Sequence, residues 1–267
     1  MTQSVLRDRY LILSEIGRGG LSRVYLGKDK NGGGAVAVKV SEQSDEGALK
    51  AALNEAEILL RLDNPGVPGF VDYFEEDGRC FVVTECMPGS PVAAGSGLSS
   101  VYTGMQLLLI LRYLHTLDRP VLHLDIKPGN VLLSPDGRVS LIDFGSAVRS
   151  GALSYIRSGT PGYCAPEQLL GKTLDERTDI YGWGMLMRYM LSGDEAGSLS
   201  AGGAVPGGLS GVSPEISGRL PEIIDRCTDR DPENRFVDVE SLLCEMKKVC
   251  SSHEPFFAQG VWEYHSA

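Results

Sequence analysis

Three side chains in the middle of the chain carry oxygen atoms suited to metal binding and proton transfer. Asp125 and Asn130 lie close together, and Asp143 follows a short apolar run. Carboxylate and amide oxygens are ligands that Mg²⁺ prefers, and a carboxylate can also accept a proton as a general base. Lys127 adds a positive charge beside Asp125. This spacing favours magnesium-assisted phosphate chemistry, whereas either segment taken alone would also fit an unrelated loop capped by Asp or Asn.

A second candidate feature is the glycine-rich segment GRGGLSRV at 17–24. It lies between two expected strands, Tyr10–Ile16 and Ser22–Gly27, and not before a helix. This context disfavours a dinucleotide-binding fold, in which the glycines open onto a helix N-terminus. Glycines at a hairpin tip would instead let backbone N–H groups approach phosphate oxygens. Glycine-rich hairpins are common, so this segment alone does not identify a site.

Lys39 and Glu55 form the third candidate feature. Lys39 ends a strongly apolar run, and Glu55 lies inside the wide apolar arc of a helix predicted from Gly47 to Leu62, an arc that also contains Leu53 and Leu60. A carboxylate buried without a cation is costly. An ion pair between Lys39 and Glu55 would lower this cost and leave an ammonium group available to anionic oxygens of a ligand. A solvated strand-end lysine and a glutamate at the edge of the helix are the simpler alternatives.

The elements that must position these residues fall into two groups. Before residue 88, short β-branched and aromatic runs predict one largely antiparallel sheet, with strands at 10–16, 22–27, 35–40, 69–74 and 80–85. After Met87, a Gly/Ser-rich connection reaches Gly104, and helical patterns follow at 105–117, 179–191, 220–229 and 236–249. We therefore expect a β-rich lobe at 1–87, a larger helical lobe at 88–250 and a tail at 251–267. The segment Gly193–Pro214 predicts a mobile surface loop.

Composition excludes several classes of protein. The 267 residues are 42% hydrophobic and 22% charged, as in an ordinary globular protein. The net charge of −10 argues against a nucleic-acid partner, which requires a basic surface. Thirty-three glycines are about 12% of the chain, against roughly 7% in average proteins, and indicate tight turns or flexible stretches.

The remaining sequence signals concern the cellular compartment. The six cysteines are scattered without a CxxC pair, so we expect reduced thiols and neither a zinc nor a dithiol site. The chain has no apolar run long enough for a membrane span and no signal-peptide pattern, which predicts a cytoplasmic location. The sequence leaves open a membrane anchor beyond Ala267, the oligomeric state and the activating signal.

Taken together, the motifs resemble those of the eukaryotic-like (Hanks-type) serine/threonine protein kinase family. The resemblance extends from about Tyr10 to about Lys248, with the motifs in the order of the family. The wording GTPGYCAPEQ is similar to that of bacterial members. The motifs are GRGGLSRV at 17–24, AVK at 37–39, HLDIKPGN at 123–130, DFG at 143–145, GTPGYCAPE at 159–167 and DIYGWG at 179–184.

The resemblance implies an α+β, bilobal protein-kinase-like fold and a role for each matching residue. It implies that Asp125 orients the substrate hydroxyl and that Lys127 stabilises the transferring phosphoryl group. It implies that Lys39, held by Glu55, contacts the α- and β-phosphates of ATP. Asn130 and Asp143 would bind Mg²⁺, with Mn²⁺ as an alternative. The residues implied to bind the nucleotide are Ile16, Gly17, Arg18, Gly19, Gly20, Ser22, Val24, Ala37, Lys39, Thr84, Glu85, Met87, Asn130, Leu132 and Asp143.

The implied activity is transfer of the γ-phosphoryl group of ATP to serine and threonine hydroxyls of protein substrates in signalling, including autophosphorylation. Glu167 would be buried and paired with Arg235. A pseudokinase that acts as a nucleotide-binding scaffold is the alternative function, although Lys39, Asp125, Asn130 and Asp143 are all present. A small-molecule phosphotransferase is disfavoured because the segment 159–167 is intact.

Three residues depart from, or specialise, the family pattern. Ser22 replaces the third glycine of the loop, which the family tolerates. Leu124 replaces the arginine that usually precedes the catalytic aspartate, which makes this a non-RD type. We therefore expect activity that does not depend on activation-loop phosphorylation in the common way. Thr84 resembles a small gatekeeper and predicts an accessible pocket behind adenine.

Overall fold

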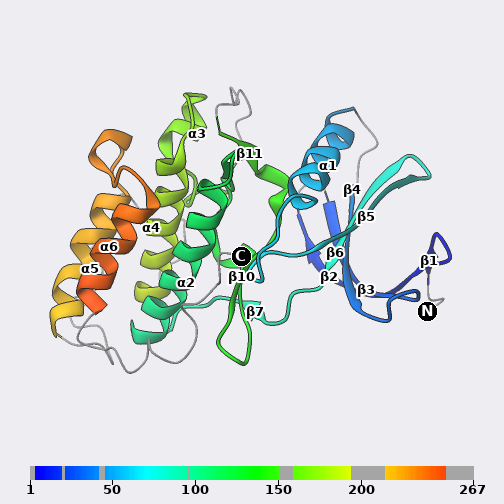
Figure 1. The fold of residues 1–267 in the computed structure, drawn as a ribbon, viewed down its shortest axis with the longest axis horizontal. Helices are drawn as coiled ribbons and strands as arrows, with labels where there is room; N and C mark the ends of the chain where they lie inside the picture. The colour runs from blue at the N-terminus through cyan, green and yellow to red at the C-terminus, as the bar shows by residue number, and fades with distance from the viewer. Residues whose placement is uncertain are drawn as a thin grey trace. The chain divides into compact units, whose positions relative to one another are not determined.

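The computed structural model describes residues 4–19, 22–41, 46–95, 97–150, 159–193 and 214–250. The chain divides into two compact units (Figure 1). Unit 1 extends to Pro88 and also includes Ile142–Gly145, and unit 2 comprises Gly89–Leu141 and the described residues from Ser146 onward. The segment Asp143-Phe144-Gly145 therefore packs with unit 1, although it follows the first elements of unit 2 in the sequence.

Some expectations lie outside the described residues. They are Gly20, most of the expected loop at Gly193–Pro214, and the tail at 251–267. Within the part of the chain that the structure describes, no helix combines the length and apolar character needed to cross a membrane.

The described part of unit 1 contains a six-stranded antiparallel sheet with the order β1-β2-β3-β4-β6-β5. The five strands predicted from the sequence are confirmed, and the short β1, which pairs with β2, was not predicted. The two glycine-containing turns at 31–34 and 76–78 connect neighbouring strands. The strands are β1 Val5–Leu6, β2 Tyr10–Arg18, β3 Ser22–Asp29, β4 Ala35–Ser41, β5 Phe70–Glu76 and β6 Arg79–Glu85.

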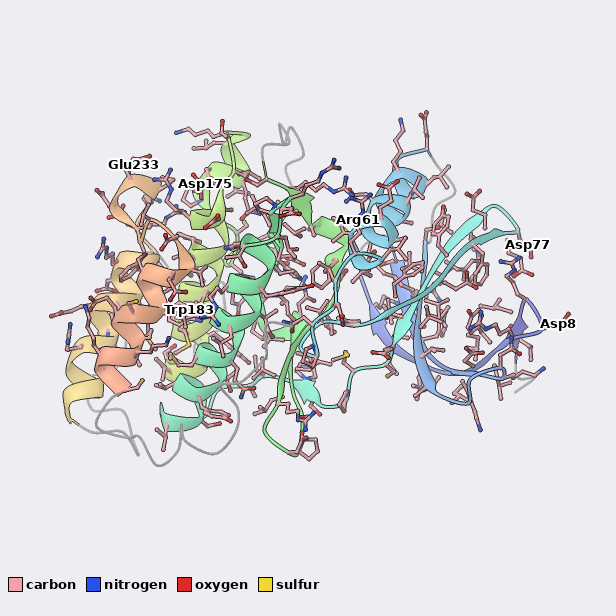
Figure 2. The ribbon with its side chains drawn as sticks, in the orientation of Figure 1. Asp8, Arg61, Asp77, Asp175, Trp183 and Glu233 are labelled. Carbon is pink, nitrogen blue, oxygen red and sulfur yellow. The ribbon has the colours of Figure 1, made fainter. Side chains whose placement is uncertain are left out.

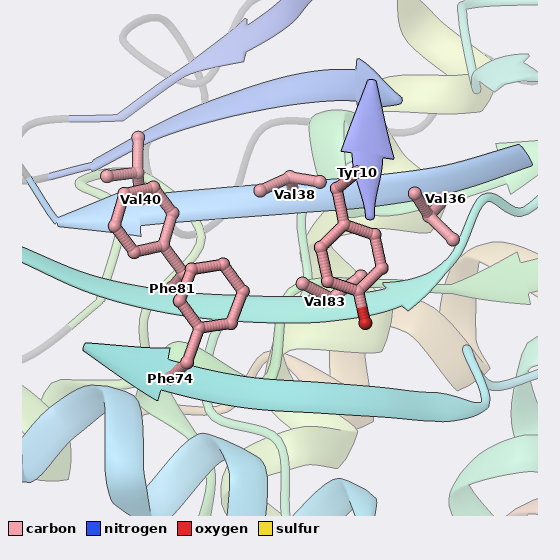
Figure 3. Close-up of a cluster of buried hydrophobic side chains, with 7 residues drawn as sticks. All are labelled: Tyr10, Val36, Val38, Val40, Phe74, Phe81 and Val83. Atoms are coloured by element: carbon pink, nitrogen blue, oxygen red, sulfur yellow. The ribbon is translucent and has the colours of Figure 1, made fainter. Parts of the chain in front are cut away.

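The two faces of this sheet have different contents. One face carries a buried apolar cluster, in which the rings of Phe74 and Phe81 stack with centroids 4.8 Å apart (Figure 3). Because successive side chains of a strand point to opposite faces, Lys39 and Ala37 lie on the face away from this cluster. The register pairs Ala37 with Thr84 on that same face. The members of the cluster are Tyr10, Val36, Val38, Val40, Phe74, Phe81 and Val83.

Helix α1, Glu46–Leu59, is the helix predicted at 47–62, but its buried face is narrower than expected. The buried side chains are Glu55, Ala56, Ile58 and Leu59. Leu53 is 43% exposed on the helix, and Leu60, which the predicted arc includes, lies beyond the end of the helix at Leu59 and is 67% exposed. A straight helix packs only one stripe against a sheet, so the edges of a wide apolar arc remain in solvent.

Unit 2 is built mainly of helices, and its longest helix begins earlier than the sequence predicted. Helix α2 starts at Gly97, within the segment we expected to be a Gly/Ser-rich connection up to Gly104. The small residues of this segment allow close packing against α4: the Trp183 indole donates a hydrogen bond to the Gly104 carbonyl at 2.9 Å (Figure 2), and the Ser100 hydroxyl donates one to the Met190 carbonyl. The helices are α2 Gly97–His115, α3 Pro166–Leu170, α4 Glu176–Ser192, α5 Pro214–Cys227 and α6 Val239–Cys250.

Short elements that the sequence did not predict hold the loops of unit 2. Strand β8, Val121–Leu122, pairs with β11, Val148–Arg149, and the 3₁₀ turn at Pro128–Asn130 leads directly into β9. Strand β9, Val131–Leu133, pairs with both β10, Val139–Leu141, and β7, Ser90–Pro91. The loop that contains Asp125 is thus bounded by a paired strand at each end.

The predicted ion pair between Glu167 and Arg235 is confirmed. The two carboxylate oxygens accept hydrogen bonds from the Arg235 guanidinium at 2.6 and 2.8 Å, and both residues are almost fully buried. Arg235 also donates to the carbonyls of Asp229 and Arg177, and the Thr178 hydroxyl donates to Glu167. The pair thereby links α3, α4 and the segment before α6.

Replacing Arg235 with alanine should destabilise unit 2 strongly, because it leaves the Glu167 carboxylate buried without a cation. We expect a loss of about 3–5 kcal/mol in the free energy of unfolding, measured by urea denaturation. The matched control is Arg219→Ala, since Arg219 pairs with Glu245 at the surface at 3.2 Å and exposed pairs contribute about 1 kcal/mol or less. Equal losses in the two variants would contradict the importance of the buried pair.

Candidate active site

In unit 1, the Lys39 ammonium lies between two carboxylates. It donates to Glu55 at 2.8 and 3.1 Å and to Asp143 Oδ1 at 2.6 Å. The predicted pair of Lys39 and Glu55 is confirmed, and the contact with Asp143 was not predicted. Glu55 is buried, whereas the side chain of Asp143 is 41% exposed. The cluster therefore has one enclosed carboxylate and one that faces solvent.

Burial and charge act in opposite directions on the Lys39 ammonium. Burial disfavours its charged form, but the charges of Glu55 and Asp143 outweigh this effect and raise the pKa of Lys39 above its usual value. Burial also raises the pKa of the Glu55 carboxyl, even though Lys39 opposes this shift. Lys39 therefore stays positively charged at neutral pH and can interact with anionic oxygens of a ligand.

A side chain at Gly145 would crowd this cluster. A Cβ atom at this position would lie 2.6 Å from Lys39 Nζ and 3.2 Å from Asp143 Oδ1. Asp143 itself has a left-handed backbone, with φ of 64°, and the Gly145 N–H donates to its carboxylate. The ring of Phe144 is fully buried and anchors the segment. The local backbone thus fixes the direction of the Asp143 carboxylate.

The glycine-rich segment forms the hairpin between β2 and β3. Gly17 pairs with Val24, and the Gly19 N–H donates to the Ser22 carbonyl at 2.8 Å. Among the described residues, a Cβ atom at Gly17 would make only ordinary contacts, the nearest at 3.6 Å to Val24. Packing within the protein therefore does not require glycine at position 17. Arg18 and Ile16 are exposed on this hairpin.

The face of the sheet that carries Lys39 also carries Val24, Ala37 and Thr84, three of the other residues predicted to contact a nucleotide. Val24 pairs with Lys39, and Ala37 pairs with Thr84; all four are partly exposed. After β6, the Glu85 N–H is bound to the Gly69 carbonyl. Within the described part of the chain, no hydrogen bond involves the backbone of Met87. This backbone is therefore able to bind the polar edge of a planar ligand.

In unit 2, Asp125 is the centre of a second cluster. Lys127 Nζ donates to Asp125 Oδ2 at 2.6 Å, and the Thr160 hydroxyl donates to Asp125 Oδ1 at 2.7 Å. Lys127 also donates to Thr160 at 2.9 Å. Asn130 Nδ2 donates to both the Asp125 carbonyl and Oδ2 at 2.9 Å. The structure thus brings together Asp125, Lys127 and Asn130 and adds Thr160.

These contacts determine which atoms remain for chemistry. Because the Asn130 amide nitrogen is bonded to Asp125, the amide oxygen is the atom left to act as a hard metal ligand. Within the described residues, no group of three or more His, Cys, Asp or Glu side chains could hold a metal ion. Leu132 lies on β9 in unit 2 and is buried.

A buried carboxylate on α4 holds the backbone in front of Asp125. Asp179 accepts the His123 N–H at 2.9 Å and the Leu124 N–H at 2.8 Å. Its Oδ2 atom lies 2.9 Å from His115 Nε2. Burial opposes ionisation of Asp179, but the hydrogen bonds and charge of these partners outweigh it and lower the pKa of Asp179. An ionised Asp179 therefore fixes the backbone at the start of the loop that contains Asp125.

The sequence places Asp179 within the DIYGWG motif but does not indicate its role, and no sequence pattern marks His115. An aspartate within an otherwise apolar helical pattern is the signal that could have identified Asp179, because such a carboxylate needs buried donors. Nothing in the local sequence identifies its donors, since they lie on α2 and in the loop that contains Asp125.

Comparison with known proteins supports one family. A model of the protein kinase domain matches residues 10–249. The chain is 28% identical over 264 residues to a probable serine/threonine-protein kinase PknB of Lactococcus lactis, covering 91% of this chain and 42% of that protein. It is 30% identical over 282 residues to the serine/threonine-protein kinase PknL of Mycobacterium tuberculosis, covering 93% of this chain and 67% of that protein. The chain thus spans less than half of the length of the Lactococcus relative.

Asp179→Asn should destabilise the chain at neutral pH, because an amide nitrogen would replace one of the two oxygens that accept backbone N–H groups. A group with a lowered pKa contributes stability above its pKa in the unfolded chain, about 3.9 for aspartate, and this contribution is lost as the pH falls through the lower folded value. The stability difference between wild type and variant should therefore be constant from about pH 7 to 5 and shrink below about pH 4.

The measurement is urea unfolding at a series of pH values, and the matched control is Asp118→Asn. Asp118 is exposed, so its substitution should have little effect at any pH. A stability difference for Asp179→Asn that stays the same down to pH 3 would contradict the role of the ionised carboxylate.

Proposed function

The chain belongs to the protein kinase domain family, and from this premise we propose that it transfers the γ-phosphoryl group of ATP to serine and threonine hydroxyls of proteins. The observation that carries the proposal is the set of contacts on Asp125, which Lys127, Asn130 and Thr160 hold in one orientation. The relatives named serine/threonine-protein kinases support the same reaction and acceptor class.

ATP binding is supported by the charge distribution and by the open face of the sheet. The chain has a net charge of −10, so a polyphosphate needs local positive charge to bind. Lys39 supplies such a charge in unit 1, beside the glycine-rich hairpin, where backbone N–H groups can approach phosphate oxygens. Thr84 and Ala37 lie on the same face of the sheet and are partly exposed, so a ligand can contact them. We propose that this face binds the nucleotide.

The residues proposed to bind Mg²⁺ have suitable chemistry. Asn130 offers an amide oxygen because its nitrogen is bonded to Asp125, and Asp143 offers a partly exposed carboxylate. Both are hard oxygen ligands, which suit Mg²⁺ and also Mn²⁺. When bound, the ion would neutralise charge that develops on the phosphate oxygens.

Asp125 would accept the proton of the acceptor hydroxyl. Its carboxylate accepts a hydrogen bond from the Thr160 hydroxyl, so it is oriented to accept one from the hydroxyl of a substrate. The substrate oxygen forms a bond to the γ-phosphorus while the bond from that phosphorus to the oxygen bridging the β- and γ-phosphates breaks. The hydroxyl proton passes to Asp125, and Lys127 stabilises negative charge on the transferred group.

Two finer features form part of the proposal. With Leu124 in front of Asp125, the chain is of the non-RD type, and we propose that its activity does not require activation-loop phosphorylation. We also propose autophosphorylation. This is tested by mixing active chain with an Asp125→Asn chain of different mass: label on the inactive chain supports transfer between molecules, and an unlabelled mixture contradicts autophosphorylation.

Asp125→Asn tests the activity itself. The amide cannot accept the proton, so phosphoryl transfer to a generic protein substrate should fall by about 10²–10⁴-fold. ATP should still raise the thermal unfolding temperature of the variant, because Lys39 and the glycine-rich hairpin are unchanged. Label transfer by Asp118→Asn should match that of the wild type. Thermal stabilisation by ATP with no transfer by the wild type would instead support the nucleotide-binding scaffold.

Glu55→Gln tests the role of the ion pair with Lys39. Hydrogen bonds between charged groups contribute about 1.5–3 kcal/mol, so kcat/KM for ATP should fall by about tenfold or more. Glu57→Gln is the matched control, because Glu57 lies on the same helix but is exposed, and its kcat/KM should stay within about twofold. Equal effects of the two substitutions would argue against a specific role for Glu55.

A further inference from the structure

Leu124, directly before Asp125, has an unusual backbone conformation. Its φ is 65°, in the left-handed region that a bulky side chain rarely adopts. The backbone is held on both sides: the Leu124 N–H donates to Asp179 Oδ1 at 2.8 Å, and its carbonyl accepts from Gln168 Nε2 at 2.9 Å. Because Asp125 is the next residue, this backbone conformation sets the direction in which the Asp125 side chain points.

The side chain of Leu124 is buried in an apolar cluster. It is 3% exposed and packs with Leu122 and Leu174, which are 1% and 4% exposed. Val148 is partly buried and packs against the same residues. We call these four residues the leucine cluster. No charged side chain belongs to it, so a charged group at position 124 would be buried among apolar atoms.

The leucine cluster connects parts of unit 2 that are distant in the sequence. Val148 lies on β11, shortly after Gly145, and pairs with Leu122 on β8. The Ser150 N–H donates to the Pro120 carbonyl at 2.7 Å and extends this attachment. Leu174 lies between α3 and α4, beyond Glu167. The cluster thus contacts residues that flank the segment between Gly145 and Glu167 and joins both sides to the loop of Asp125.

We propose that Leu124 is a positioning residue and that the leucine cluster fixes both Asp125 and the flanks of this segment by apolar packing. The function we assign to Leu124 rests on the proposed phosphoryl transfer. This apolar packing involves no charged group, so it holds the flanking residues to the loop of Asp125 without a phosphate group. A positively charged side chain at position 124 could not replace the packing of Leu124, because none of the other cluster residues carries a negative charge.

The test compares Leu124→Ala and Val148→Ala with Leu124→Met and with Leu170→Ala as the exposed-leucine control, since Leu170 is 64% exposed. Displacement of Asp125 should lower kcat by about tenfold in Leu124→Ala, with KM for ATP within about twofold. Leu124→Met retains apolar volume and should keep at least about half of the activity. Leu124→Arg should be at least as impaired as Leu124→Ala.

Amide hydrogen exchange on the full chain gives a readout that does not depend on activity. The Ser150 and Val148 amides, which lie in the hydrogen-bonded positions of this strand pair, should exchange about tenfold faster in Leu124→Ala and in the milder Val148→Ala, while those of α6 stay unchanged. Unchanged exchange at 148–150, or equally faster exchange in α6, would overturn the proposal. If the wild type transfers no phosphoryl group, the proposed function fails, and the exchange result still decides whether the cluster anchors these residues.

Phosphatase treatment tests whether the attachment needs phosphate. Wild-type chain that is treated with a phosphatase and then separated from it should keep its kcat within about twofold. A loss of tenfold or more on treatment, or recovery of activity in Leu124→Arg only after phosphorylation, would overturn the proposal.

Discussion

The hydrogen bonds of the buried Asp179 carboxylate hold together the part of unit 2 that positions Asp125. It is 1% exposed, and a charge in that position is tolerated only when donors surround it. Two of these donors are backbone N–H groups in front of Asp125, and the third is the ring of His115 on α2. Helix α2, the loop that contains Asp125 and α4 are therefore joined at one point. The unusual backbone of Leu124 is held there because its N–H has this single strong acceptor.

Unit 1 solves a similar problem by a different route. Lys39 and Glu55 are brought together because a strand places Lys39 on one face of the sheet and α1 turns its buried stripe toward it. Asp143 arrives from a distant part of the sequence and makes the second contact with the ammonium group. In a chain with a net charge of −10, this arrangement maintains one fixed cation where an anionic ligand can approach.

Several features followed from local sequence because their causes are local. Alternating apolar runs and turns predicted five strands, and the cost of burying a lone carboxylate predicted the pair of Glu55 with Lys39. The pair of Glu167 with Arg235 was implied by the family resemblance. The predicted start of the helix at residue 105 was wrong, because α2 begins at Gly97. The small residues before 105 suggested a loosely packed connection, but they form the contact with α4. The wide apolar arc predicted for 47–62 is only partly buried, because a sheet covers one stripe of a helix and leaves Leu53 exposed, and because the helix ends at Leu59, before Leu60.

The amino-acid sequence by itself determined which chemical groups the protein has and the family to which its motifs belong, since residue types and their spacing can be read directly along the chain. Beyond the pairs of Lys39 with Glu55 and of Glu167 with Arg235, only the tertiary structure decided which groups meet. The contact of Asp143 with Lys39, the donors of Asp179 and the apolar environment of Leu124 all join residues far apart in the chain. Such contacts depend on how helices and strands pack, because burial removes water and makes each polar group find its partner within the fold.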